Sequence, residues 1–490
     1  MENNYNLLDN PLITYSYSIN NKIELNITLT EEEIKIFDFI QSTIEKHNLK
    51  IEVRVAGGWV RDKVLNLKSH DIDLVISGMK CIEFGLLLNK ELNQNEKNCK
   101  IYRKENSRKK FDLICVPIFK KKIDIVNIRY NKFKEDSPLE DALNRDITIN
   151  SLLYNLNEKK VEDFTEKGLN DLKNGIINTT IDPYIKLKVE PYLIIRIIRF
   201  SIRFNFKIDD NLNKTIIDNI DELKILINQK NYYDKIKIEL GNILNLENAH
   251  IGIYFLYKYK LLNMLYEISN FYPKNLNKEK ENINIVNYFI IGYYVIKNKI
   301  KLVEKDRFKL NLILLNISFV KYLKSFFDRV TLNLNRSNDE IKTKNLILSN
   351  LEEYKKIVLS GNYNRLNIGN IIKKIKYEMI QILLIVIIID EYFKKFCNNI
   401  NFIINNINEE FINDLYNKFK NLLEFIEKEN LKSVENIIPL ISKNELNDII
   451  QINDFEKNKQ IFTFMLEKQI EFPNISKNDL IKLLKEYQFK

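Results

Sequence analysis

The chain has 490 residues, more than one hydrophobic core ordinarily serves, and this length therefore predicts several domains. Hydrophobic residues at 45% and charged residues at 29% exclude wholesale disorder and predict a core-forming protein. The net charge of +10 favours a polyanionic partner without identifying which one.

The cysteines give no sign of a zinc site or a disulfide framework. Cys81, Cys99, Cys115 and Cys397 stand far apart, and the chain has only three histidines to join them as ligands. This usage indicates a reducing compartment. The most apolar run, residues 379–389, is about half the roughly 20 residues that a membrane-spanning helix needs, and it predicts a buried helix and no membrane partner.

In chain order, residues 1–30 show little pattern and are predicted to be an N-terminal extension. They lack the apolar core of a secretory signal and the arginines of an import presequence. Cytoplasm is therefore the expected compartment, with the nucleus or a mitochondrion or other organelle as alternatives. The hydroxyl of Thr30 before three glutamates predicts the start of a helix that runs over residues 31–48.

Residues 51–130 change to short segments rich in Ile and Val. Strands are predicted at 51–56, 71–77, 111–119 and 122–129. After Glu140 the pattern is read as helical to the end of the chain, because long Ile, Leu, Lys and Glu segments alternate with Asn-rich turns. The predicted fold class is therefore α+β, a small mixed domain followed by an all-helical part.

Two adjacent glycines, Gly57 and Gly58, end the first predicted strand and precede Arg61 and Asp62. Glycine is scarce here, with 11 in the chain. Because glycine lacks Cβ, this pair allows a sharp turn whose N–H groups approach a ligand closely, as a triphosphate requires. A plain strand-to-helix turn is the alternative.

Two carboxylates follow nine residues later, at Asp71 and Asp73. On a strand, residues two apart point to the same face, so both carboxylates project together. Such a pair of hard oxygen ligands suits Mg²⁺, which can join carboxylates to the phosphates of a nucleoside triphosphate. A paired-metal site of this kind activates a 3′-hydroxyl and stabilises the leaving pyrophosphate. A solvated surface pair is the alternative.

These segments resemble the first motif of eukaryotic class II CCA-adding enzymes, relatives of the bacterial poly(A) polymerases. The resemblance rests on residues 54–62 and on Ser69-His70-Asp71-Ile72-Asp73. It continues through residues 140–155, where the family reads Arg-Arg-Asp followed by Asn and this chain has Asn144 before Arg145 and Asp146. Further matches are at 161–165, 171–175 and 196–204, so that about residues 29–245 are covered.

The resemblance implies a polymerase-beta-like head at 31–182, a neck at 183–245 that recognises the nucleotide base, and a body and tail at 246–490 that bind tRNA. It implies that Asp71 and Asp73 are catalytic and hold the metals, with Asp124 as a third metal ligand. The implied nucleotide-binding residues are Gly57, Gly58, Arg61, Asp62, Arg145, Asp146, Asn150, Glu190, Arg196 and Arg199.

The sequence departs from the family in the base-selection motif, which reads Glu-Asp-x-x-Arg. Anchoring on Arg196 and Arg199 aligns Glu190 with the family's Asp and Leu193 with its Arg. Leucine cannot donate a hydrogen bond to a base edge, so reduced fidelity or a narrowed nucleotide preference is predicted. Glu190 would be the surviving base contact, and Arg196, one helical turn on, is the candidate to replace the missing donor.

The resemblance implies an enzyme that adds CCA to the 3′ end of tRNA from CTP and ATP with Mg²⁺, working as a monomer. Within the enzyme class, CC-only or A-only addition and poly(A) addition are the alternatives. A tRNA-binding protein with a degenerate active site is the alternative from another class. Lys-rich segments such as 297–309 and 373–376 are candidates for phosphate contacts, with solvated helix faces as the plain interpretation.

Overall fold

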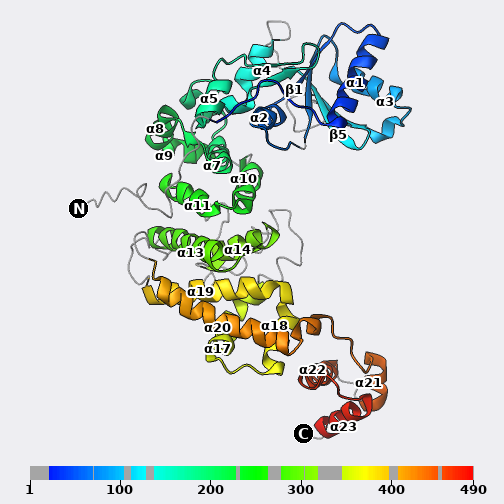
Figure 1. Cartoon of the computed structure of the whole chain (residues 1–490), viewed down its shortest axis with the longest axis vertical. Helices are drawn as coiled ribbons and strands as arrows, with labels where there is room; N and C mark the ends of the chain where they lie inside the picture. Colours follow the sequence, from blue (N-terminus) through cyan, green and yellow to red (C-terminus); the bar gives the residue numbers. More distant parts are fainter. Residues whose placement is uncertain are drawn as a thin grey trace, which may run out of the picture. The chain divides into compact units, whose positions relative to one another are not determined.

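The computed structural model describes residues 21–69, 71–103, 112–128, 137–227, 232–262, 278–302, 304–317, 345–396, 407–450 and 455–488. The chain divides into two compact units, with the boundary between Glu239 and Leu240. Figure 1 draws the first unit in blue to green and the second in green to red. Residues 1–20, most of the predicted N-terminal extension, lie outside the described residues. His70 and Cys397 also lie outside them.

A seven-stranded mixed sheet forms the centre of the first unit, in the order β3-β4-β5-β2-β1-β6-β7. Strands β2 and β5 pair in parallel, whereas the other neighbours are antiparallel. The strands are β1 Glu52–Ala56, β2 Asp73–Ser77, β3 Lys100–Tyr102, β4 Leu113–Ile118, β5 Lys121–Asn127, β6 Leu153–Asn155 and β7 Lys160–Glu162. The sheet confirms the predicted α+β class.

The prediction of continuous helix after Glu140 is wrong for part of the first unit. Strands β6 and β7 complete the sheet, and a short parallel pair joins β8 Ile176–Ile177 to β9 Lys207–Ile208. Each of these strands has only two or three residues. A segment this short shows no alternation in sequence, because its pairing is decided by strands far away in the chain.

Helices pack on the sheet through the buried side chains of β1, β2, β4 and β5, such as Val53, Leu74, Ile114 and Ile125, which are fully buried. They are α1 Glu31–Lys46, α2 Gly58–Val64, α3 Cys81–Glu91, α4 Pro138–Asn144 and α5 Gly168–Asn174. Helix α3 approaches β4 so closely that a Cβ on Gly85 would lie 2.6 Å from Ile114 Cγ2. Figure 1 shows α1 and α3 on the β5 side of this unit.

Glu33 fastens the start of α1 to α2. Its carboxylate accepts hydrogen bonds from the Thr30 N–H (2.7 Å), Trp59 Nε1 (2.8 Å) and Lys63 Nζ (2.6 Å). Burial acts to raise the pKa of Glu33, but these hydrogen bonds, led by that from Lys63, outweigh it and hold the pKa below its ordinary value. The predicted Thr30 cap is present, and it forms a capping box with Glu33.

Replacing Glu33 by glutamine is expected to lower the stability of the first unit by about 1–3 kcal/mol at neutral pH, because a buried charged acceptor is lost. A depressed folded-state pKa contributes stability above the ordinary value of 4.5, and this contribution disappears as pH falls through the lower, folded-state pKa. The difference between wild type and Glu33→Gln should therefore shrink on acidification. Thermal unfolding between neutral and acidic pH measures it.

The matched control is Glu31→Gln, which changes an exposed glutamate of the same helical turn. It should leave the unfolding midpoint unchanged at every pH. A pH-independent loss in Glu33→Gln would contradict the role given to the ionised carboxylate.

Past the head, the first unit continues in short helices: α6 Pro183–Val189, α7 Leu193–Phe204, α8 Asp210–Asp218 and α9 Ile220–Ile227, with α10 Tyr233–Asn245 spanning the unit boundary. Helix α7 has a strongly apolar face, and it buries Ile194, Ile197 and Ile198 completely. The same helix carries Arg196, Arg199 and Arg203 on its other side. The helix therefore packs into the core while it presents arginines from one face.

The described part of the second unit is helical, as predicted. Its helices are α11 Ala249–Lys258, α13 Lys278–Asn298, α14 Glu304–Ile317, α17 Leu351–Ser360, α18 Arg365–Ile375, α19 Ile380–Phe396, α20 Glu409–Lys428, α21 Lys443–Ile450, α22 Phe455–Glu471 and α23 Lys477–Gln488. The apolar run at 379–389 lies in and just before α19 and is buried apart from Gln381, which confirms the predicted buried helix. None of the described helices is long and apolar enough to span a membrane.

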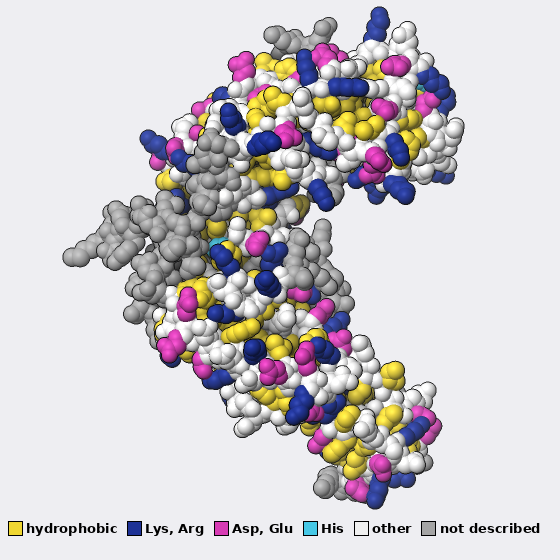
Figure 2. Space-filling model, viewed as in Figure 1, with side chains coloured by type: hydrophobic (Ala, Val, Ile, Leu, Met, Phe, Trp, Pro, Cys, Tyr) yellow, Lys and Arg dark blue, Asp and Glu magenta, His cyan; other side chains and the backbone are white. Residues whose placement is uncertain are grey.

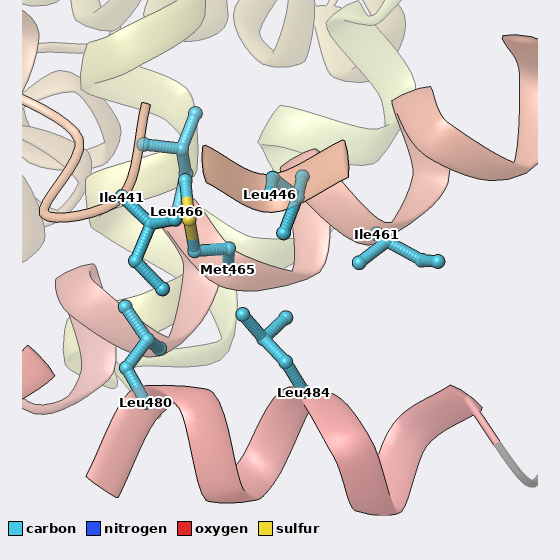
Figure 3. Close-up of a cluster of buried hydrophobic side chains, with 7 residues drawn as sticks. All are labelled: Ile441, Leu446, Ile461, Met465, Leu466, Leu480 and Leu484. Carbon is cyan, nitrogen blue, oxygen red and sulfur yellow. The ribbon is translucent and has the colours of Figure 1, made fainter. Parts of the chain in front are cut away.

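The last three helices close around an apolar cluster of their own. Figure 3 shows its seven buried side chains, which come from α21, α22, α23 and the segment before them: Ile441, Leu446, Ile461, Met465, Leu466, Leu480 and Leu484. This cluster gives the C-terminal end of the chain a hydrophobic centre separate from the sheet of the first unit.

Candidate active site

Two of the three predicted metal-ligating carboxylates are neighbours in the sheet. Asp73 is the first residue of β2, and it is the register partner of Asp124 on the parallel strand β5. Paired residues of adjacent strands project from the same face, so both carboxylates leave the sheet together. Asp73 is exposed and Asp124 is half-buried.

Asp71 lies just before β2 rather than on it, although a strand was predicted from residue 71. It is exposed and stands two residues before Asp73. Within the described residues, no three carboxylate, imidazole or thiol groups are close enough to enclose a metal ion. The donor set of exposed carboxylate oxygens nevertheless has the chemistry that Mg²⁺ prefers, with open positions for phosphate oxygens and water.

Cys115 adds a thiol beside these carboxylates. It is the register partner of Asp124 across the antiparallel pair β4 and β5. Burial, together with a hydrogen bond to Asp124 and its negative charge, raises the pKa of Cys115 to about 11. The thiol is therefore protonated at neutral pH and serves as a hydrogen-bond donor to Asp124. This contact could not be predicted from the sequence, because it depends on which strand pairs with β5.

The predicted glycine turn lies between β1 and α2. Gly57 has φ +70°, in the left-handed region that favours glycine, and a Cβ at this position would lie 3.2 Å from Arg145 Nη1. The prediction that its N–H faces a ligand is wrong, because this N–H donates to the carbonyl oxygen of Leu152 at 3.1 Å. Gly57 instead provides the turn and the space in which the Arg145 guanidinium lies.

Arg61 and Asp62 form a buried pair behind this turn. Arg61 Nε donates to Asp62 Oδ1 at 2.8 Å, and its Nη1 donates to Asn150 Oδ1. The guanidinium also lies over the ring of Phe204, with 4.5 Å between Cζ and the ring centre. Arg61 is only 3% exposed, and its hydrogen bond fixes the side chain of Asn150.

Asp146 joins this network to the neck helix. Asn150 Nδ2 donates to Asp146 Oδ1 at 3.2 Å, and Arg196 Nε lies 2.7 Å from Asp146 Oδ2. Burial acts to raise the pKa of Asp146, but the charge of Arg196 and hydrogen bonds from the Ile147 N–H and Asn150 hold the pKa below its ordinary value. Asp146 is therefore ionised, and it fixes both Asn150 and Arg196.

Glu239 is a member of the site that the sequence analysis missed. This carboxylate is 5% exposed and lies 2.5 Å from Arg199 Nε and 3.6 Å from Arg196 Nη1. On α10 it shares a face with Ile236 and Ile243, which are 1% and 0% exposed. A carboxylate at a core position of an amphipathic helix needs a cation, and this pattern was the available signal.

In the segment predicted to select the base, Glu190, Leu193 and Arg196 lie in three different environments. Glu190 follows α6, and its carboxylate pairs with Lys186 Nζ at 3.5 Å. Leu193 is 1% exposed at the start of α7 and belongs to the core. The side chain of Arg196, one turn further, is 35% exposed and is held by Asp146 and Glu239. Leu193 is therefore a packing residue, whereas Arg196 is a partly exposed cation held by two carboxylates.

Arg145 completes the set. Its Nε and Nη2 both donate to Asp141 Oδ2, at 2.9 and 2.8 Å. Asp141 is buried, so the guanidinium is fixed against Gly57 with part of its fork directed away from this carboxylate. The structure thus gathers Gly57, Arg61, Asp62, Arg145, Asp146, Asn150, Arg196 and Arg199 through contacts, whereas Glu190 has no contact with them in the hydrogen bonds and ion pairs of the described residues.

The first unit thus combines a mixed sheet that carries carboxylates on adjacent strands with a helix whose arginines are linked to it by ion pairs, as the motifs predict for a nucleotidyltransferase. Residues 53–178 match the family described as the poly A polymerase head domain. Over these residues the chain carries the head domain that the motifs predict, and it is similar to curated tRNA nucleotidyltransferases.

The similarity extends well beyond the head. The chain is 28% identical to the tRNA nucleotidyltransferase cca1 of Schizosaccharomyces pombe, over 94% of this chain and 97% of that protein. It is 25% identical to the mitochondrial CCA tRNA nucleotidyltransferase of Candida glabrata, over 94% and 96%. Among solved structures, a complex of a CCA-adding enzyme with CTP superposes with a TM-score of 0.59 at 19% identity, over 94% of this chain and 97% of the other. That likeness confirms the fold.

Proposed function

We propose that the protein adds C and A nucleotides to the 3′ end of tRNA that lacks CCA, using CTP, ATP and Mg²⁺. The observation that carries this proposal is the pairing of Asp73 with Asp124 on β2 and β5, within a head domain whose full-length relatives are CCA tRNA nucleotidyltransferases. Template-independent addition requires that protein side chains choose the base, and the neck arginines linked to the head through Asp146 fit that task.

The reaction joins the 3′-hydroxyl oxygen of tRNA to the α-phosphorus of the nucleotide. The bond from this phosphorus to the β-phosphate oxygen breaks, pyrophosphate leaves, and the hydroxyl proton passes to water or to a carboxylate. Asp71, Asp73 and Asp124 would hold Mg²⁺, which when bound would supply positive charge to activate the hydroxyl and to neutralise the leaving group.

The other side chains hold the incoming nucleotide. Arg145, fixed by Asp141, offers the free part of its fork to phosphate oxygens, and Asn150 can donate to and accept from ribose hydroxyls. Asn150 is itself held by Arg61 and Asp146. We assign base recognition to Arg196, with Glu190 as a weaker second contact, because Arg196 is a partly exposed donor that two carboxylates, Asp146 and Glu239, hold in place.

Incubation of the protein with Mg²⁺, labelled CTP or ATP and a tRNA transcript without CCA tests this function. The expected result is a stop after three added nucleotides, read on a sequencing gel. Absence of incorporation from both nucleotides would refute the proposal. A ladder of long A tails would instead identify a poly(A) polymerase, and a stop after CC or after a single A would identify a partial CCA enzyme.

The proposal of a tRNA-binding protein without activity makes a different prediction for thermal unfolding. An intact nucleotide site gives Mg²⁺-dependent stabilisation of the first unit by CTP or ATP, because a ligand that binds the folded state raises its stability. A degenerate site gives none. We propose that the protein works as a monomer in the cytoplasm. The nucleus and the mitochondrion are the alternative compartments, and the mitochondrial relative supports the second of these.

A further inference from the structure

A cavity in the second unit combines basic and aromatic side chains. It has a volume of about 290 Å³ and lies among α11, α13 and α14, so it shares no residue with the candidate active site. Three cations line it, Lys297, Lys301 and Arg307, against the single carboxylate of Glu247. The excess of positive charge favours an anionic ligand.

An aromatic wall closes one side of this cavity. The rings of His250 on α11 and Tyr293 on α13 stack with 3.8 Å between their centres and 21° between their planes. Both residues line the cavity, and because His250 is buried while Tyr293 is half-buried, Tyr293 is the ring of the pair that is more open to a ligand. Lys297, one helical turn after Tyr293, lies with Nζ 5.7 Å from the tyrosine ring centre. A cation next to an aromatic surface suits a base with its phosphate.

The guanidinium of Arg307, which lines the cavity, has a hydrogen-bond donor that is available to a ligand. Its Nη1 lies 3.6 Å from Glu247 Oε1, but the Glu247 side chain is 75% exposed, and such a pair is weak. Within the described residues, the buried Nε of Arg307 has no hydrogen-bond partner. A buried donor without an acceptor is unfavourable, and a phosphate oxygen would satisfy it.

Charge alone does not single out this site. On the face drawn in Figure 2, Lys and Arg side chains are interspersed with Asp and Glu and do not form one continuous basic stripe. Within the Lys-rich segment 297–309, Lys309 is buried and pairs with Asp306 and Glu378. Lys297 and Lys301 are exposed, and together with Arg307 they border a hollow of nucleotide size.

We propose that this cavity binds one nucleotide unit of the tRNA strand, with its base against the His250 and Tyr293 wall and its phosphate on Lys301 and Arg307. The proposal rests on the proposed function for the identity of the RNA. The second unit would then bind RNA through a specific contact in this cavity, in addition to the general attraction between lysines and phosphates.

The test measures binding of tRNA lacking CCA by fluorescence anisotropy, without nucleoside triphosphates, over a series of salt concentrations. Arg307→Gln is expected to weaken binding about tenfold and to lower the salt slope by about one, as loss of one phosphate contact does. Glu247→Gln should act in the opposite direction. It removes the carboxylate that competes for Arg307 and should tighten binding about two- to fivefold.

The matched control is Lys356→Gln, which removes one positive charge from an exposed position of α17 outside the cavity. Tyr293→Leu removes the planar wall, and thermal unfolding is measured beside it because the ring also packs on His250. If Tyr293→Leu lowers the stability of the protein, Arg307→Gln alone decides the test, because Arg307 takes no part in the ring packing.

Two results separate this inference from the proposed function. If wild type incorporates CTP and ATP but Arg307→Gln binds tRNA as tightly as Lys356→Gln does, the cavity inference is overturned and the function stands. If wild type incorporates neither nucleotide but Arg307→Gln still loses tRNA affinity, the function fails and the RNA contact is supported. Loss of AMP binding in Arg307→Gln with unchanged tRNA affinity would assign the cavity to a free nucleotide and overturn the proposal.

Discussion

Asp73→Asn is expected to lower nucleotide incorporation by about a thousandfold or more, since a metal at such a site contributes several kcal/mol of transition-state stabilisation. The substitution keeps the shape of the side chain but removes the negative charge that faces Asp124 across β2 and β5. Incorporation into tRNA lacking CCA, measured as a single-turnover rate, gives the effect. The dissociation constant for tRNA should stay within about twofold of wild type, because neutralising one carboxylate removes no contact to the RNA backbone.

The control for this experiment is Asp38→Asn, which neutralises an exposed aspartate on α1, on the same unit and away from β2. It should incorporate nucleotides at the wild-type rate. Asp71→Asn should resemble Asp73→Asn if Asp71 completes the site. A rate within tenfold of wild type for Asp73→Asn would show that the metals are held elsewhere.

Arg196→Gln is expected to reduce the preference for C and A over U and G by about ten- to a hundredfold, which corresponds to roughly 1–3 kcal/mol for a lost base-edge partner. The structure favours this variant over a change at Leu193, because an arginine introduced at a position that is 1% exposed would bury an unpaired charge. Relative incorporation of CTP, ATP, UTP and GTP measures the preference.

Glu239→Gln tests whether the carboxylate acts by positioning. It leaves Arg196 in place but removes the charge that holds it and Arg199 from α10. Discrimination should fall in the same direction as for Arg196→Gln, together with thermal stability, whereas Lys214→Gln on the exposed side of α8 should change neither. Unchanged selectivity in Arg196→Gln would mean that base choice lies with other residues.

The glycine turn and the similarity to the poly A polymerase head domain could be predicted from the sequence because they depend on residues close together in the chain. The pairing of Asp73 with Asp124 could only be suggested, since it is fixed by the parallel register of two strands that are far apart in sequence. The core-facing position of Glu239 on α10 could have been noticed in the sequence, but its partners Arg196 and Arg199 are known only from the structure.

The burial of individual residues could not be read from residue types alone. Leu193, which aligns with the family's arginine, lies in the core because the apolar face of α7 packs there. The N–H of Gly57 was assigned to a ligand, although β6 supplies its partner through the residue just before that strand. Strands β6 and β7 have three residues each, which is too few to show an alternation of apolar and polar residues in the sequence.

The position of Gly57 also limits how this protein can evolve. Any other residue there would meet two independent obstacles, a backbone with φ +70° and the guanidinium of Arg145 at 3.2 Å from the new Cβ. A smaller residue at position 145 would relieve the second obstacle while the first remained. A lineage that loses this glycine therefore has no single compensating change open to it, and reversion is the shortest way back to an intact turn.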